Sequence, residues 1–200
     1  MSQQALPSLA VLISGRGSNL QAFIDACDSG HLPARIGLVI SNNPAAAGLQ
    51  RAERAGIATQ CIDHRDYQSR EAFDGALVDA LRACDIELVI LAGFMRILTP
   101  VLIEPYLGRL LNIHPSLLPK YRGLHTHRRA IEAGDTSHGC TVHLVTPELD
   151  DGPVLGQATV PILPDDTPDT LAARVLEQEH RLYPAVLRRF ASGNTARLDL

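Results

Sequence analysis

The chain has 200 residues, of which 46% are hydrophobic and 20% charged, and its formal net charge is −4. This composition is ordinary for one globular domain and excludes a low-complexity or disordered chain. The negative charge and the 4% aromatic content disfavour a nucleic acid or an anionic membrane as a partner, so they favour a small-molecule substrate.

The beginning of the chain, MSQQALPS, lacks a basic segment followed by an apolar core, and no apolar run reaches the length of a membrane span. We therefore expect a cytoplasmic protein. The cysteines are dispersed and form neither a CxxC pair nor a zinc-binding spacing, which predicts buried, reduced thiols. They are Cys27, Cys61, Cys84 and Cys140.

Apolar runs bounded by turn residues alternate with helical patterns over residues 9–113, which is typical of βα units and a parallel sheet. The predicted strands lie near Leu9–Ile13, Ile36–Ile40, Ala58–Ile62, Leu88–Leu91 and Arg109–Ile113. The predicted helices lie near Ser18–Cys27, Ala45–Ala55 and Arg70–Ala83.

The pattern changes beyond residue 135. GCTVHLV and GPVLGQATVPI read as strands joined by the turn-rich segment TPELDDG, which predicts a β-hairpin. A last helix is expected to start near Thr167 or Thr170 and to end near Phe190. We predict one domain over residues 1–200, with an α/β fold: a Rossmann-like, doubly wound, mostly parallel sheet with an antiparallel C-terminal hairpin.

The segment VLISGRGSNLQAFIDA predicts a strand, a tight turn at Gly15 and Gly17, and a helix with Ser18 or Asn19 as its N-cap. Backbone amides at such a helix start can bind a phosphate. A dinucleotide motif requires glycine where Leu20 stands, and a P-loop requires a lysine after the glycines, so NAD and a nucleoside triphosphate are disfavoured. A phosphomonoester site and a purely connecting glycine turn both remain open.

The segment LLNIHPSLLP places an amide and an imidazole at the end of a predicted strand. Because side chains alternate along a strand, Asn112 and His114 emerge on one face, at the edge where open α/β sheets bind ligands. An amide N–H beside a protonated imidazole is suited to an oxyanion, and Asp150 in the hairpin turn could keep that ring protonated. Taken singly, these residues also fit a strand cap, an interior histidine and a turn former.

Two longer runs carry a resemblance to a known family: LNIHPSLLPKYRGLHTHRRAIEAG and HGCTVHLVTPELDDGPVLGQ. They resemble the formyltransferases that use 10-formyltetrahydrofolate, and in particular the members that act in purine biosynthesis. Within that family's HxVxxxxDxG motif the chain supplies His143, Val145, Asp150 and Gly152, and the resemblance extends through ISGRGSNLQA, LAGFMRIL and EQEHRLYP. It implies that the amine of glycinamide ribonucleotide attacks the formyl carbon, with Asn112, His114 and Asp150 as catalytic residues.

The resemblance also implies roles for other positions. The residues matched to ribonucleotide binding are Gly17, Ser18, Asn19, Arg109 and Glu179. The residues matched to folate binding are Arg70, Met95, Arg96, Ile97, Leu98 and Asn112. Without the family, FMRIL reads as buried core. The implied division assigns ribonucleotide binding to the N-terminal part, and folate binding and catalysis to the C-terminal part.

Helical spacing places Glu179 on one stripe with Val175, Leu182 and Val186, so its carboxylate needs a partner. The family makes that partner the substrate's amine and ribose. His125, His127 and His138 lack a coherent set of metal ligands, and the family uses no metal.

Two positions depart from the family pattern. Arg122 stands where some relatives have proline, and Asp151 places a second carboxylate beside Asp150 where a small residue is common. We expect the first to alter loop rigidity and the second to act on Asp150 through repulsion.

Three alternatives carry different expectations. A methionyl-tRNA formyltransferase is expected to have a further C-terminal nucleic-acid-binding domain, and a formyltetrahydrofolate hydrolase a further regulatory domain. A noncatalytic sensor of phosphorylated metabolites would not need Asn112, His114 and Asp150 together. We therefore expect an enzyme with small-molecule substrates, as a monomer or a homodimer.

Overall fold

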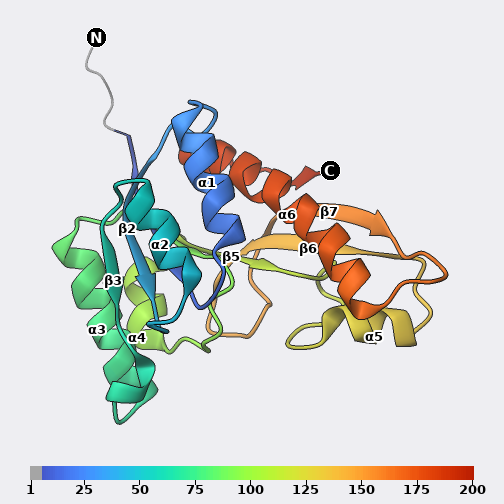
Figure 1. The fold of residues 1–200 in the computed structure, drawn as a ribbon, viewed down its shortest axis with the longest axis horizontal. Helices are drawn as coiled ribbons and strands as arrows, with labels where there is room; N and C mark the ends of the chain where they lie inside the picture. Colours follow the sequence, from blue (N-terminus) through green and yellow to red (C-terminus); the bar gives the residue numbers. More distant parts are fainter. Residues whose placement is uncertain (1–5) are drawn as a thin grey trace. The chain divides into compact units, whose positions relative to one another are not determined.

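Strands and helices alternate along the chain in the computed structural model, which describes residues 6–200 (Figure 1). The chain divides into two units: the first ends at Leu111 and the second comprises Asn112–Leu200. Each unit contains its own strands and helices.

Parallel strands form the centre of the first unit. They are β1 (Ser8–Ile13), β2 (Arg35–Ser41), β3 (Thr59–Cys61) and β4 (Leu88–Leu91). β1 pairs with β2 and β4, and β3 pairs with β2, so their order is β3-β2-β1-β4. Every residue of β1 and β4 is buried, because inner strands of a parallel sheet are covered on both faces.

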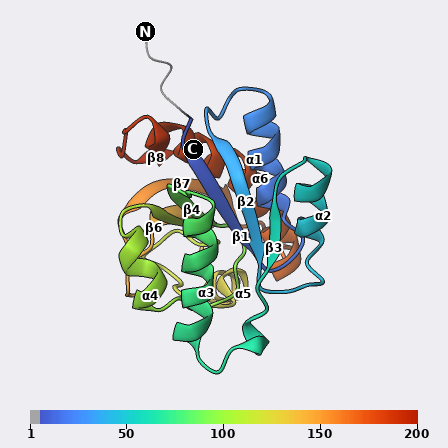
Figure 2. The same ribbon diagram turned by 90° about the vertical axis from the view of Figure 1, so that its left-hand side faces the viewer.

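Helices cover both faces of these strands. They are α1 (Ser18–Asp28), α2 (Ala47–Arg54), α3 (Arg70–Ala83) and α4 (Pro100–Ile103). Figure 2 shows α1 and α2 on one side of the strands and α3 and α4 on the other. Short 3₁₀ turns occupy His64–Asp66 and Glu104–Tyr106.

The start of α1 differs from the prediction. Its N-cap is Gly17, in the left-handed conformation with φ 69°, and no side chain caps the helix. Ser18 and Asn19 are instead its first two residues, so the predicted side-chain cap is wrong. A left-handed N-cap is accessible to glycine at little cost, and it leaves the first amides of the helix uncapped by a side chain.

The second unit contains the antiparallel hairpin. β5 (Leu110–His114) crosses into it from the first unit, followed by β6 (Ser137–Leu144), β7 (Val154–Pro161) and β8 (Leu198–Asp199). β6 and β7 pair in antiparallel register, and the short β8 runs parallel to β7. The prediction of a mostly parallel α/β fold with an antiparallel C-terminal hairpin is confirmed.

Two helices complete this unit: α5 (Thr126–Glu132), which the sequence reasoning missed, and α6 (Pro168–Ala191). α6 packs against β6, β7 and α5. Thr167 caps α6 by accepting from the Thr170 amide, and the Thr170 hydroxyl accepts from the Thr167 amide. This reciprocal cap explains why both threonines signal the helix start.

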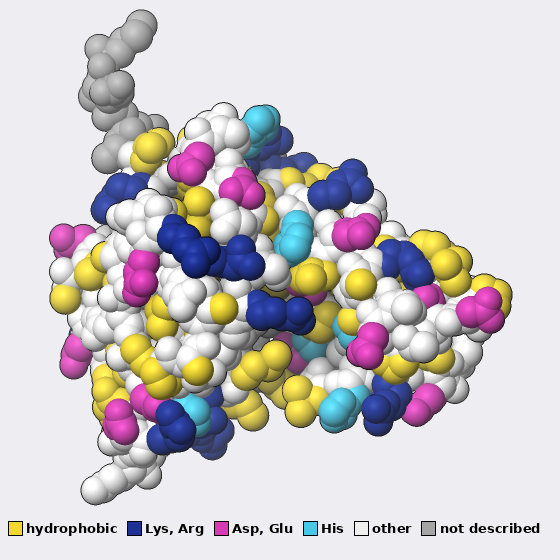
Figure 3. All heavy atoms as spheres, viewed as in Figure 1, with side chains coloured by type: hydrophobic (Ala, Val, Ile, Leu, Met, Phe, Trp, Pro, Cys, Tyr) yellow, Lys and Arg dark blue, Asp and Glu magenta, His cyan; other side chains and the backbone are white. Residues whose placement is uncertain are grey.

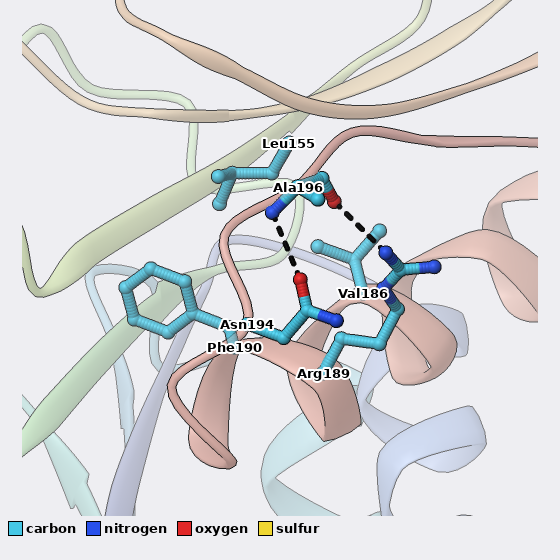
Figure 4. A pocket seen from close by; sticks show the side chains of 6 residues that line it. All are labelled: Leu155, Val186, Arg189, Phe190, Asn194 and Ala196. Carbon is cyan, nitrogen blue, oxygen red and sulfur yellow. Dashed lines mark hydrogen bonds between the residues drawn. The ribbon is translucent and has the colours of Figure 1, made fainter.

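The turn after α6 is closed by two hydrogen bonds (Figure 4). The Ala196 amide donates to Asn194 Oδ1 at 3.0 Å, and Arg189 Nη2 donates to the Ala196 carbonyl at 3.3 Å. Leu155, Val186 and Phe190 complete the lining of the hollow around them, which leaves no room for a water-sized molecule. We read it as a packing feature of the helix end.

Charged side chains of both signs lie on one face of the molecule. On the face drawn in Figure 3, Lys and Arg side chains lie interspersed with Asp and Glu side chains. Among the described residues, no helix combines the length and apolar character needed to cross a membrane.

All four cysteines are free, but their exposure differs from the prediction. Cys140 is buried, Cys27 and Cys84 are half-buried, and Cys61 is exposed. The prediction of buried thiols is confirmed for Cys140 and wrong for Cys61, because Cys61 ends β3, the edge strand of its unit. Burial raises the pKa of Cys27 to about 11, which keeps that thiol protonated near neutral pH.

Candidate active site

The carboxyl end of β5 carries two of the predicted catalytic side chains. Asn112 is half-buried and His114, the last residue of the strand, is 7% exposed. Asn112 Nδ2 lies 3.2 Å from His143 Nε2 in β6, and His114 Nδ1 lies 3.4 Å from Asp150 Oδ2 in the turn after β6. The second unit thus brings Asn112, His114 and Asp150 into one cluster, with His143 as a fourth member.

His114 is held between two acceptors. Its Nδ1 faces the Asp150 carboxylate, and its Nε2 lies 2.9 Å from the backbone oxygen of Tyr121. The contact of Nε2 with the Tyr121 carbonyl is a hydrogen bond, whereas Nδ1 and the Asp150 carboxylate lie at ion-pair distance. The side chains of His114 and Asp150 are each only 8% exposed, so the pair is largely shielded from water.

His143 orients the Asn112 amide. Its Nδ1 lies 2.9 Å from the Leu144 carbonyl, which can only accept, so this nitrogen carries the proton. Burial lowers the pKa of His143, which favours the neutral ring with an acceptor lone pair on Nε2. Asn112 therefore donates one N–H to His143. The 3.8 Å between His143 Nε2 and Asp150 Oδ1 is too long for a hydrogen bond.

Asp150 lies in a turn with a constrained backbone. Its φ of 49° is in the left-handed region, which non-glycine residues rarely adopt. The Gly123 amide donates to Asp150 Oδ2 at 3.0 Å and helps to fix the carboxylate. A Cβ at Gly152 would lie 1.8 Å from the Leu144 carbonyl oxygen, so only glycine fits two residues after Asp150.

The glycine loop of the first unit joins β1 to α1. Its Gly15 carbonyl accepts from the Gly48 amide at 3.0 Å, so α2 supports the loop. A Cβ on Gly17 would lie 2.7 Å from the Gly48 Cα, so the absence of side chains lets the two helix starts meet. The loop delivers Ser18 and Asn19 at the amino end of α1, where amides and the helix dipole can bind an anion.

Residues 95–98 follow β4 and form an exposed apolar segment. Met95 is 73% exposed and Ile97 is 58% exposed, so the interpretation of FMRIL as buried core is wrong for these two residues. The Met95 amide donates to the Ser14 hydroxyl at 2.8 Å, which ties this segment to the glycine loop. Arg96 Nε is buried and has no hydrogen-bond partner among the described residues. Large exposed apolar side chains in one segment are typical of a binding surface.

Arg109 lies at the other end of the parallel strands from the glycine loop. Its guanidinium donates to the Pro105 carbonyl at 2.8 Å and to the Glu87 carbonyl at 3.3 Å. Its own carbonyl accepts from Val89 near the start of β4, whereas the loop with Gly17 follows the carboxyl end of β1. The first unit does not bring Arg109 to that loop, and this placement does not support a phosphate contact.

The other two predicted residues lie on helices. Arg70 is exposed at the first position of α3, which Ser69 caps. Glu179 is 8% exposed on the inner face of α6, and the burial of its stripe is confirmed. Its buried neighbours on that stripe are Val175, Leu182 and Val186. Five of the six residues matched to folate lie in the first unit, and Asn112 lies in the second.

His127 and His138 face each other in the second unit, with His138 Nε2 at 3.1 Å from His127 Nδ1. Burial lowers the pKa of His138 to about 4 and also lowers that of His127. Both rings are therefore neutral near neutral pH. Among the described residues, no three His, Cys, Asp or Glu side chains form a group that could hold a metal ion.

Comparisons with known proteins show the family of this chain. The Formyl transferase family model matches residues 8–187. The chain belongs to this formyltransferase family. It is 53% identical to phosphoribosylglycinamide formyltransferase of Escherichia coli over 93% of the chain and 88% of that protein. The corresponding Haemophilus influenzae protein is 48% identical over 94% of the chain and 89% of its own length.

Solved structures are similar to this formyltransferase throughout its fold. Glycinamide ribonucleotide transformylase 1 from Symbiobacterium toebii superposes with a TM-score of 0.94 and 47% identity, covering 96% of the chain and 90% of that structure. Phosphoribosylglycinamide formyltransferase from Brucella melitensis gives a TM-score of 0.89 and 52% identity, covering 94% and 97%. The resemblance inferred from the sequence motifs is confirmed.

Several residues of the formyltransferase cluster lacked an assigned role in the sequence reasoning. His143 is the first residue of the HxVxxxxDxG motif, so the motif indicated that this position is part of the site. The spacing of residues in the sequence did not predict its hydrogen bond to Asn112. Tyr121 and Gly123 act through backbone atoms in a loop. Backbone contacts of this kind leave little signal in the residue type, because every residue carries a carbonyl and every residue except proline carries an amide N–H.

Proposed function

We propose that this chain transfers the formyl group of 10-formyltetrahydrofolate to the amine of 5-phosphoribosylglycinamide. The products are formylglycinamide ribonucleotide and tetrahydrofolate, a step of purine (IMP) biosynthesis that we assign to the cytoplasm. The observation that carries the proposal is the Asn112–His143 and His114–Asp150 arrangement in a chain of this family. The names of its relatives support the same substrates.

In the proposed reaction, the substrate amine attacks the formyl carbon and the carbonyl oxygen becomes an oxyanion. Asn112 donates one N–H to His143 and directs its second N–H to that oxygen. His114, positively charged and paired with Asp150, stabilises the same negative charge. The new C–N bond then remains, the bond from the formyl carbon to the folate nitrogen breaks, and that nitrogen takes up the proton lost by the amine.

Binding roles follow from charge and exposure. We propose that the amides of Gly17, Ser18 and Asn19 bind the ribonucleotide phosphate, since an uncapped helix start favours an anion. Glu179 binds the amine and ribose region. Residues 95–98 form the apolar wall and backbone partners of the folate ring system, with Arg70 and Asn112 as further folate contacts. In this proposal residues 1–200 act as one formyltransferase domain that uses no metal.

A spectrophotometric assay with both substrates tests the proposal. Turnover should require both substrates, proceed without added metal and survive a chelator. Release of tetrahydrofolate without the ribonucleotide would indicate a hydrolase, and formylation of methionyl-tRNA would indicate the tRNA enzyme. Either result in the absence of ribonucleotide formylation would refute the proposal.

A further inference from the structure

Three consecutive residues between β5 and α5 contact His114, Asp150 or the turn that carries Asp150. The Tyr121 carbonyl accepts from His114 Nε2 at 2.9 Å, and the Gly123 amide donates to Asp150 Oδ2 at 3.0 Å. Between them, the Arg122 guanidinium forms an ion pair with the Asp151 carboxylate. The segment 121–123 therefore meets both members of the charged pair through its backbone and the neighbouring turn through a side chain.

The backbone of this segment does not favour these contacts by itself. Tyr121 has φ 57° and Asp150 has φ 49°, a left-handed region that is unfavourable for residues other than glycine. Gly123, with φ 78°, adopts the same region without that cost. Tertiary contacts must therefore hold Tyr121 and Asp150 in place.

Two anchors supply such contacts. On one side, the Tyr121 hydroxyl donates to Asp135 Oδ2 at 2.7 Å, and Lys120 Nζ lies 2.9 Å from the same oxygen. On the other side, Arg122 pairs with Asp151 and connects the loop to the turn that carries Asp150. The Arg122 carbonyl also accepts from Arg129 Nη1 at 2.7 Å, which fixes the backbone between the two anchors.

The ion pair joins Arg122 of one loop to Asp151 of another. Asp151 alone would place a second negative charge beside Asp150, and Arg122 alone would leave a cation in the loop. Paired, they neutralise each other where the two loops meet. Nothing in a single sequence connects position 122 to position 151, so the pairing follows only from the structure.

We propose that Arg122 and Asp151 are positioning residues, whose ion pair holds the Tyr121 carbonyl and the Gly123 amide against His114 and Asp150. The pair thereby keeps His114 doubly protonated and oriented for charge stabilisation. The effect of the Arg122–Asp151 pair on the rate rests on the proposed formyl transfer. The effect of the pair on the His114 ring does not depend on which reaction is catalysed.

The competing explanation is an ordinary surface ion pair. The two side chains are 42% and 43% exposed, and exposed pairs contribute little to stability. A positioning pair changes the His114 ring and the rate even when stability is almost unaffected, so these two measurements separate the explanations.

Four variants test the proposal: Arg122→Ala, Asp151→Ala, the charge-swapped double variant Arg122→Asp/Asp151→Arg, and the control Asp199→Ala. Asp199 forms an ion pair with Arg197 at 2.7 Å in the same unit. The side chains of Asp199 and Arg197 are both exposed, as are those of Arg122 and Asp151. Urea unfolding of each variant checks that the fold is retained.

The first readout uses the substrate-free protein. The ¹⁵N chemical shifts of the His114 ring distinguish the doubly protonated form from each neutral tautomer. Both single variants should decrease the doubly protonated fraction near neutral pH, and the swapped variant should restore it. Asp199→Ala should match the wild type. This readout remains valid if formyl transfer proves to be the wrong reaction.

The second readout is kinetic. Each single variant should lower kcat about threefold to tenfold with little change in KM, and the swapped variant should recover most of the loss. High salt should reduce the wild-type rate toward that of Arg122→Ala, because exposed charges are screened. Wild-type His114 shifts and kcat in both single variants would overturn the proposal. A lower KM with unchanged kcat would also overturn it. That result would mean that residues 121–123 occupy the substrate site and are displaced when substrate binds.

Discussion

Gly17 offers the sharpest test of the glycine loop, because the structure separates its role in the fold from its role in binding. Replacing it with alanine adds a Cβ at 2.7 Å from the Gly48 Cα, a backbone atom that cannot rotate away. It also forces alanine to adopt φ 69°. The matched control is Gly15→Ala in the same loop, where a Cβ would meet nothing within 4 Å and φ is not in the left-handed range.

The expected cost for Gly17→Ala has two parts. The left-handed backbone costs roughly 1–2 kcal/mol for a residue with a Cβ, and the overlap with α2 costs about 1–3 kcal/mol as an overpacked contact. Together they should lower the free energy of unfolding by about 2–5 kcal/mol. Gly15→Ala should stay within about 0.5 kcal/mol of the wild type.

Urea denaturation measures the stability of both variants, and calorimetry on the folded protein measures binding of glycinamide ribonucleotide and of a folate. Folded Gly17→Ala should bind the ribonucleotide more weakly, because its α1 amides are displaced, while folate binding changes less. Equal stability of the two variants would refute the overlap argument. Unchanged ribonucleotide binding by folded Gly17→Ala would refute the phosphate site.

Further predictions concern the second unit. Asn112→Ala should lower kcat about a hundredfold to a thousandfold, far more than it raises KM, as for other oxyanion donors; a normal kcat would place the chemistry elsewhere. His143→Ala should lower kcat about tenfold in steady-state assays, since the Asn112 amide loses the partner that orients it; it should not lower kcat further when Asn112 is already alanine. Asp150→Asn should lower kcat and let it recover partly toward lower pH, where His114 is protonated without the carboxylate; a pH-independent loss would contradict this. Folded His138 binds fewer protons than unfolded His138, because its pKa falls from 6.5 to about 4, so stability should decrease as pH falls through that window, by up to about 3 kcal/mol. Urea unfolding at several pH values should show a weaker acid dependence in His138→Gln, and an identical dependence would remove this histidine as the cause.

Local sequence patterns predicted most of the fold. The bounds of α3 and β4 agree residue by residue, because helical periodicity and a buried apolar run are properties of neighbouring residues. α5 was missed because it has only seven residues and follows His125 in a left-handed conformation without a side-chain cap. β8, with two residues, has too little length to produce a pattern.

The sequence by itself placed Asn112 and His114 on one face at the end of a strand and Asp150 in the hairpin turn, and its motifs identified the family. Only the tertiary structure decided how these groups are held: His143 directs Asn112, Tyr121 accepts from His114, and a pairing across the loops opposes the charge that Asp151 adds. The reason is physical. Periodicity reports which side of an element a residue faces, whereas hydrogen bonds between loops depend on backbone positions that the packing of distant segments establishes.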